Sequence, residues 1–322
     1  MNDYDYIQMG LDSVPLGDVK IAIVDGTTNV LNAQKNYGIN AYANSLTIDG
    51  VTTTGADGDG SGSFTVNTTA STTAPNMGIQ VMSNDTTSGN LAINSCVLNV
   101  NAAEGTKSSS VGLNINGSVT LGLADKPSNK QNPVVNITSG NAANDSVGIY
   151  AINGSFIGYD ETLTVTTGDV TATTQVSHSI AITVGESITF GTSGATMQNV
   201  YASLSAGKTN GTSRIKGQSF GLCAQTGISI NSGNVYAAAT QSDVAAYSEA
   251  YALYCSGGSG INIEGYTTEA GSKFNIDNAA SEFTIGDTVI QQSDFSQPVS
   301  ITENDVVLKL LKGKYLSGPG WS

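Results

Sequence analysis

The chain has 322 residues and a formal net charge of −14 at pH 7, from 12 Lys and Arg against 26 Asp and Glu. This balance argues against nucleic-acid binding, because the neutralisation of phosphates requires clustered basic side chains. No apolar run approaches the length that crosses a membrane. The three Cys form no CxxC pair of the kind found in metal or redox sites.

Residues 1–36 are predicted to form an N-terminal cap together with the first strands. An apolar alternation over 19–24 predicts a strand, and Asp25-Gly26 predicts a turn after it. The first residues are acidic and show no signal peptide. We expect a secreted or cell-surface protein whose leader has been removed from this sequence.

A short phrase recurs along residues 37–270, which are predicted to form the coils of a solenoid. Each copy places two apolar residues two positions apart, so that both point to the same side of a strand. The copies are Gly38-Ile39-Asn40-Ala41, Gly78-Ile79-Gln80-Val81, Gly112-Leu113-Asn114-Ile115, Gly148-Ile149-Tyr150-Ala151, Ser179-Ile180-Ala181-Ile182, Gly221-Leu222-Cys223-Ala224 and Ala252-Leu253-Tyr254-Cys255.

A second phrase with the same alternation follows each copy of the first. Its copies are Leu46-Thr47-Ile48, Leu91-Ala92-Ile93, Val119-Thr120-Leu121, Leu163-Thr164-Val165, Ile188-Thr189-Phe190, Ile228-Ser229-Ile230 and Ile261-Asn262-Ile263. A third, weaker strand is predicted at Val170-Thr171-Ala172 and Val235-Tyr236-Ala237. Three short strands per repeat, joined by loops of variable length, are typical of a parallel β-helix. We therefore predict an all-β, single-domain β-helix of about 7–10 coils, right-handed by the usual rule for crossover connections.

The stretch 55–62 interrupts the first repeat and is rich in Asp and Gly. The spacing of Asp57, Asp59 and Ser61 resembles the opening of a calcium-binding loop. Thr68 occupies the position where such loops carry their bidentate Glu. A Ca²⁺ site at these three residues is one interpretation, and a plain flexible turn is the other.

Tyrosines give the other functional indication. Tyr150 and Tyr254 occupy the same outward slot of their repeats, and Tyr236 and Tyr251 lie in the last repeats. A tyrosine on a flat sheet face can stack on a sugar ring and use its hydroxyl for a hydrogen bond. These four are the candidate ligand-binding residues, although an outward Tyr is also simply a favourable strand residue.

Catalytic motifs are sparse. Arg214-Ile215-Lys216 resembles a triplet of polygalacturonases, which share the β-helix fold, but the sole His, His178, lies in Ser-His-Ser and not in their Gly-His-Gly. Asp and Glu are not concentrated from repeat to repeat. We predict no catalytic residues and no enzymatic activity. A polysaccharide lyase or glycoside hydrolase stays the alternative, since hydrolysis needs only two carboxylates, which different coils could supply.

Residues 271–322 are predicted to form the C-terminal coils and a cap, with strand-like patterns at 274–276, 283–285 and 299–301. The only Trp, Trp321, lies one residue from the end and is interpreted as a packing or tail residue.

The phrases Gly-Ile-x-Ala, Leu-Thr-Ile-x-Gly and Gly-x-Val-x-Ala, over residues 37–265, resemble those of right-handed β-helix surface proteins of gut bacteria. The resemblance implies an adhesin-like, carbohydrate-binding rod or stalk that is secreted or attached to the cell wall. Its expected partners are glycans or host surface material, without nucleic acid, membrane insertion or a cofactor other than the calcium considered above. A segment of a phage tail fibre or spike is a further hypothesis, and it predicts a trimer where the surface protein predicts a monomer.

Overall fold

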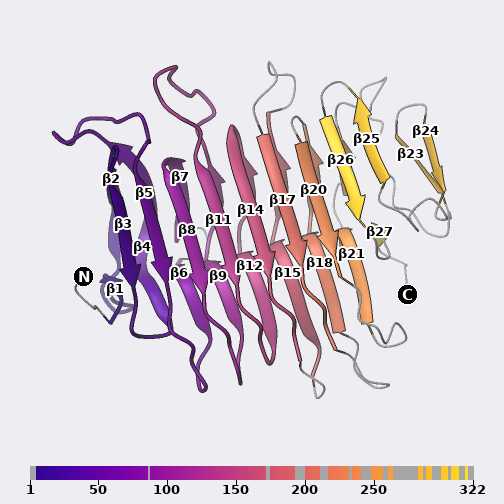
Figure 1. Cartoon of the computed structure of the whole chain (residues 1–322), viewed down its shortest axis with the longest axis horizontal. Coiled ribbons are helices and arrows are strands. Elements are labelled where there is room, and N and C mark those ends of the chain that lie inside the picture. Colours follow the sequence, from indigo (N-terminus) through magenta and orange to yellow (C-terminus); the bar gives the residue numbers. More distant parts are fainter. Residues whose placement is uncertain are drawn as a thin grey trace.

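A computed structural model of the protein describes residues 5–85, 88–171, 175–192, 200–210, 217–231, 234–240, 248–256 and 260–263, together with the strands 282–285, 288–291, 299–303, 306–311 and 316–317. In this part of the chain every regular element is a β-strand and none is a helix. The strands stack into a rod whose coils follow one another from β1 to β21 (Figure 1).

Each coil has three sides, which we call faces 1, 2 and 3, and contributes one strand to each. Face 1 consists of β1 (Ile7–Met9), the first part of β4 (Tyr37–Val51), β6 (Asn76–Met82), β9 (Ser110–Ile115), β12 (Asp145–Ala151), β15 (Ser177–Val184), β18 (Gly217–Ala224), β21 (Ser248–Cys255) and β27 (Leu316–Ser317). Face 2 consists of β2 (Leu16–Val24), the second part of β4, β7 (Asn90–Ser95), β10 (Val119–Leu121), β13 (Phe156–Gly158), β16 (Ser187–Phe190), β19 (Gly227–Ile230) and β22 (Gly260–Ile263).

Face 3 consists of β3 (Thr28–Asn32), β5 (Ser63–Asn67), β8 (Val97–Ala102), β11 (Val134–Ser139), β14 (Glu161–Thr167), β17 (Val200–Ala206), β20 (Asn234–Ala239), β26 (Val306–Leu311) and β25 (Val299–Glu303). The long strand β4 continues through one corner, so faces 1 and 2 form one 16-stranded sheet, while face 3 is a 9-stranded sheet. From β1 to β22, each strand pairs in parallel with a strand of an adjacent coil, which confirms the predicted parallel β-helix. Its handedness stays a prediction.

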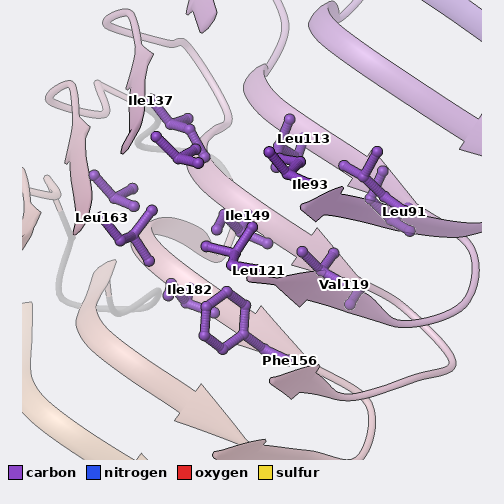
Figure 2. Close-up of a cluster of buried hydrophobic side chains, with 14 of the residues drawn as sticks. Leu91, Ile93, Leu113, Val119, Leu121, Ile137, Ile149, Phe156, Leu163 and Ile182 are labelled. Carbon is purple, nitrogen blue, oxygen red and sulfur yellow. The ribbon is translucent and has the colours of Figure 1, made fainter. Parts of the chain in front are cut away.

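The core runs along the axis of the rod and is built from the inward side chains of all three faces. Leu113, Ile149 and Ile182 stack in register on face 1 and are fully buried (Figure 2). Phe156 of face 2 and Leu163 of face 3 complete the same layers (Figure 2). Full burial of one such side chain contributes about 1.5–3 kcal/mol, so each coil adds its own share of the core.

Two of the predicted repeat copies are wrong, one in its register and the other in the strand to which it was assigned. The copy at 179–182 is shifted by two residues, because Ile182, not Ile180, pairs with Ile149 of the preceding coil. Ala181 replaces the Gly that marks this position in earlier copies, and the alternation of apolar residues reads equally well in either register.

The second copy is the phrase at 163–165, which lies on face 3 in β14 and not on face 2. The face 2 strand of that coil is β13, where Phe156 pairs with Val119. Gly158 occupies the second inward position of β13, so this strand lacks the apolar pair by which the others were recognised. Val170, predicted to begin a third strand, makes isolated parallel bridges with Ala142 and Thr209 and belongs to no strand, whereas 235–237 lies in β20 as predicted.

The ends of the chain differ from each other. Within 1–36, the strands β1, β2 and β3 make a first coil in register with β4 and β5. Beyond 270, β26 continues face 3 in parallel with β20, whereas β25 pairs with β26 in antiparallel fashion and β23 (Glu282–Ile285) pairs with β24 (Thr288–Gln291). The triplet 214–216 and Trp321 lie outside the described residues.

Candidate functional site

The outer surface of face 1 is shaped by a ladder of glycines. The strand pairing skips Gly148, since Val147 pairs with Val111 and Ile149 pairs with Leu113. A Cβ on Gly148 would meet the Ala181 carbonyl and the side chain of Val165 on face 3. The chain therefore bends toward the core at this position, and only a residue with a small side chain or none fits there.

This bend places two outward residues three positions apart in each coil. In β12 these are Val147 and Tyr150, while Ile149 between them points into the core. The first of the two rows so formed is apolar and is called the outer stripe: it contains Met77, Val111, Val147, Ile180, Phe220 and Tyr251, one residue from each successive coil. The second row contains Asn40, Gln80, Asn114, Tyr150, Thr183, Cys223 and Tyr254.

The outer stripe ends in an aromatic cluster on β18 and β21, which are neighbours on face 1 (Figure 1). The rings of Phe220 and Tyr251 are stacked with centroids 5.7 Å apart. Tyr254 lies beside both, at 5.0 Å from Phe220 and 5.9 Å from Tyr251. Phe220 and Tyr251 are 4% and 8% exposed, so Tyr254 is the half-buried ring that offers its surface to solvent.

The structure brings together only two of the four predicted tyrosines. Tyr251 and Tyr254 are in contact. Tyr150 occupies the same row as Tyr254 but three coils earlier, about 14 Å away at the usual strand spacing. Tyr236 lies on face 3 in β20, and its side chain is outside the described residues. Sequence reasoning missed Phe220, although an apolar residue three positions before each outward slot is a visible signal.

A polar margin accompanies the outer stripe on the side where the strands begin. His178 Nδ1 lies 2.9 Å from Asp145 Oδ1 of the neighbouring coil, and the Ser109 hydroxyl donates to the other oxygen of that carboxylate. The hydroxyl thus contacts the acid and not the imidazole, which leaves it without the base that a nucleophile requires. Burial, with a smaller contribution from Asp145, raises the pKa of Tyr150, so its hydroxyl stays neutral.

The predicted calcium residues Asp57, Asp59 and Ser61 lie in the loop after β4, and a calcium site there stays a prediction. Asp57 has an exposed side chain, 4.0 Å from the Lys130 ammonium group. One carboxylate oxygen of Asp59 accepts a hydrogen bond from the Ser61 amide. Asp25 is bound by the amides of Asp59 and Gly60. Within the described residues, no group of three or more His, Cys, Asp or Glu is placed to hold a metal ion.

A buried charge cluster next to this loop was not predicted. The Asp49 carboxylate, at the end of face 2, accepts from Lys130 at 3.1 Å, from Lys20 at 3.1 Å and from Ser95 at 2.9 Å. Burial opposes ionisation of Asp49, but hydrogen bonds from Lys20, Lys130 and Ser95 outweigh it and lower its pKa. The cluster ties loop 122–133 to the β4 coil across the intervening coil, and the Gln131 amide adds a bond to the Asp59 carbonyl.

Cysteine chemistry is limited by burial. Cys96, Cys223 and Cys255 are all free. Cys255 faces the core, whereas Cys223 packs against the outer stripe, as their slots in the repeat predicted. Burial raises the pKa of Cys96 to about 12 and that of Cys223 to about 11, so neither thiol is a nucleophile near neutral pH.

Comparisons with known proteins add no assignment: no protein-family model, no curated protein and no solved structure matches the chain. None of the described residues belongs to a helix that could cross a membrane. The candidate site therefore rests on its geometry alone.

Proposed function

We propose that the protein is a non-catalytic β-helical rod of the cell surface or the secreted fraction, and that it binds carbohydrate on the outer surface of face 1. The observation that carries this proposal is the contact among Phe220, Tyr251 and Tyr254 on two adjacent coils. Phe220 and Tyr251 are buried and stacked on each other in the cluster that also contains Ile180, so these two rings are held in place before a ligand arrives. Rigidity of this kind lowers the entropy lost on binding.

The chemistry of the surface suits a sugar more than an ionic ligand. The half-buried Tyr254 presents an apolar ring with a polar tip, the combination that stacks on a sugar ring and bonds its hydroxyls. Thr183 and Asn114 lie in the same row and add neutral hydrogen-bonding groups. A net charge of −14 disfavours anionic polymers, so we expect neutral glycans.

The test is a glycan array followed by calorimetry on each glycan that binds. Tyr254→Ala is expected to weaken binding about 2- to 10-fold, the loss of one aromatic stacking contact. The matched control is Tyr201→Ala, because Tyr201 is 42% exposed but lies on face 3, away from the cluster. Equal losses in both variants, or no bound glycan at all, would argue against this site.

A reducing-end assay on the bound polysaccharides separates this proposal from its alternative. New reducing ends would show a lyase or hydrolase, and they would overturn the non-catalytic assignment. Binding without cleavage, lost in Tyr254→Ala alone, is the expected result.

A further inference from the structure

The first coil of the rod exposes side chains whose counterparts in the second coil are buried. No described strand pairs with the outer edges of β1, β2 or β3, which lie together at one end of the rod (Figure 1). Val19 and Ile21 of β2 are only partly buried, whereas Leu46 and Ile48, their partners in the next coil, are fully buried. Among the described residues, these two inward side chains are therefore incompletely covered at this end of the rod.

The segment between β1 and β2 does not cover these side chains. Leu11 and Val14 pair across a short turn, and both are more than half exposed. Asn84, two coils further along, donates to the carbonyl of Asp12 in this turn. The turn consequently lies along the flank of the rod, and the edge of β2 stays accessible.

The hydrogen-bonding groups of β2 alternate between β4 and the open edge. The Asp25 amide, one residue after the strand, donates to Val51 of β4. Because these groups alternate in direction along a strand, the amides and carbonyls of Asp18, Lys20 and Ala22 point away from β4, to the unpaired edge of β2. The described residues offer no strand that could bond to them there. Such an edge is a template for another strand.

We propose that two copies of this chain associate head to head through β2, in place of the monomer expected from the sequence. In an antiparallel pairing centred on Val19, Asp18 of each copy lies opposite Lys20 of the other. The exposed Leu16 then lies opposite Ala22. In this pairing the backbone groups of Asp18 and Lys20, which point to the open edge, can form hydrogen bonds between the two copies. A pairing centred on Ile21 would instead place Lys20 opposite Ala22 and form no ion pair.

The rest of the end coil is compatible with this symmetry. A two-fold axis through Val19 exchanges faces 1 and 3 of a three-sided coil, so β1 of one copy lies over β3 of the other with its direction reversed. The partly buried Ile7, Met9 and Val19 would then be covered by the second copy. The product is one rod of doubled length with a continuous core and both candidate glycan sites free.

The test is sedimentation analysis of the full chain across protein concentrations, with charge reversals at the edge. The wild-type chain is expected to form a dimer that dissociates on dilution. In a dimer of either variant, Asp18→Lys or Lys20→Asp, residues 18 and 20 carry the same charge and face each other at both symmetry-related contacts. Each substitution is therefore expected to weaken dimerisation about tenfold or more. An equimolar mixture of the two variants restores opposite charges at both contacts and is expected to form heterodimers.

Two further variants guard against loss of folding, since Lys20 also binds Asp49. Asp125→Lys makes the same charge change as Asp18→Lys on the exposed loop 122–133 and is expected to leave dimerisation unchanged. Ala22→Pro removes one amide of the open edge without disturbing the pairing to β4, and it is expected to abolish the dimer. A monomeric wild type at high concentration, a trimer, or dimers unaffected by Asp18→Lys would overturn the proposal.

Discussion

Glu161 carries a carboxyl group that is buried without a hydrogen-bond partner, although carboxyl groups prefer water or a polar partner. It begins β14, is fully buried, and neither carboxyl oxygen has a hydrogen-bond partner. Gly158, at the end of β13, provides the room, because a Cβ there would collide with the Glu161 carboxyl group. Burial, with a smaller contribution from Asp160, raises the pKa of Glu161 well above its ordinary value, so folding favours the neutral form of this group.

This burial predicts a stability that falls as pH rises. The pKa of Glu161 is higher in the folded protein than in the unfolded chain, so the unfolded chain loses this proton first as pH rises. The contribution of the neutral group to stability is complete below the unfolded pKa of about 4.5, and it is lost as pH rises from there to the folded pKa. Glu161→Gln is expected to remove a slope of about 1.4 kcal/mol per pH unit in this window. Urea unfolding from pH 4 to 9 measures it, with Glu104→Gln, an exposed position, as control. Parallel pH profiles for wild type and Glu161→Gln would contradict the assignment.

The glycine ladder shows how far single residues carry a prediction. Gly38, Gly78, Gly112 and Gly148 were recognised as the first residues of the first four copies, and the structure gives the reason, since a Cβ on each would meet the neighbouring coil. Where Ala181 takes this place, the sequence lost its marker and the predicted register shifted by two. The glycine therefore identifies the register of a copy only where it is present, and a copy with alanine in its place can be aligned in either register.

Loop 122–133 acts as a strap across neighbouring coils. Lys130 is 81 residues from Asp49 in sequence, and both side chains are 5% exposed. The corner of the coil between them is tight, with Cys96 alone joining β7 to β8, whereas the coils on either side have long loops. The two loops consequently meet over that corner, where the Gln131 amide donates to the Asp59 carbonyl, and the ion pair fastens loop 122–133 to β4.

Removing the lysine should loosen this strap. Lys130→Met is expected to destabilise the chain by about 3 kcal/mol, because breaking a buried pair leaves the carboxylate short of a partner while Lys20 and Ser95 remain. Lys107→Met, at an exposed position, is expected to change stability by less than about 0.5 kcal/mol. Urea denaturation at neutral pH compares the two variants, and equal stabilities would show that the pair contributes nothing.

Over the whole molecule, stability is expected to depend on position along the rod. The strands of each coil in a solenoid pair only with those of its neighbours, so a central coil is supported on two sides and the first coil on one. Ile149 is fully buried in a central coil, and Ile21 is partly buried in the first. The same substitution at the two positions therefore isolates the effect of the missing neighbour.

Ile149→Ala is expected to cost about 2–5 kcal/mol, the usual range for a large core side chain. Ile21→Ala is expected to cost less than half as much, because its side chain already contacts water. Urea denaturation of both variants at low protein concentration, where head-to-head pairs dissociate, provides the comparison. A larger loss in Ile21→Ala would mean that the first coil is already covered under those conditions.

The sequence by itself determined the architecture of this protein. Apolar residues two positions apart, repeated with loops of variable length, can bury their side chains only by stacking parallel strands around one core. That alternation predicted which side chains point into the core and which point outward. The structure confirms the inward positions of Ile39, Ile149 and Cys255 and the outward positions of Tyr150 and Tyr254.

Only the tertiary structure decided which side chains from different coils meet. Loop lengths between copies vary, so sequence separation does not reveal that Phe220 contacts Tyr254 or that Lys130 reaches Asp49. The same holds for Glu161, whose burial depends on the missing side chain of Gly158. Contacts of this kind arise when the coils stack in register, because the physical neighbour of a residue in a β-helix lies one turn away and not along the chain.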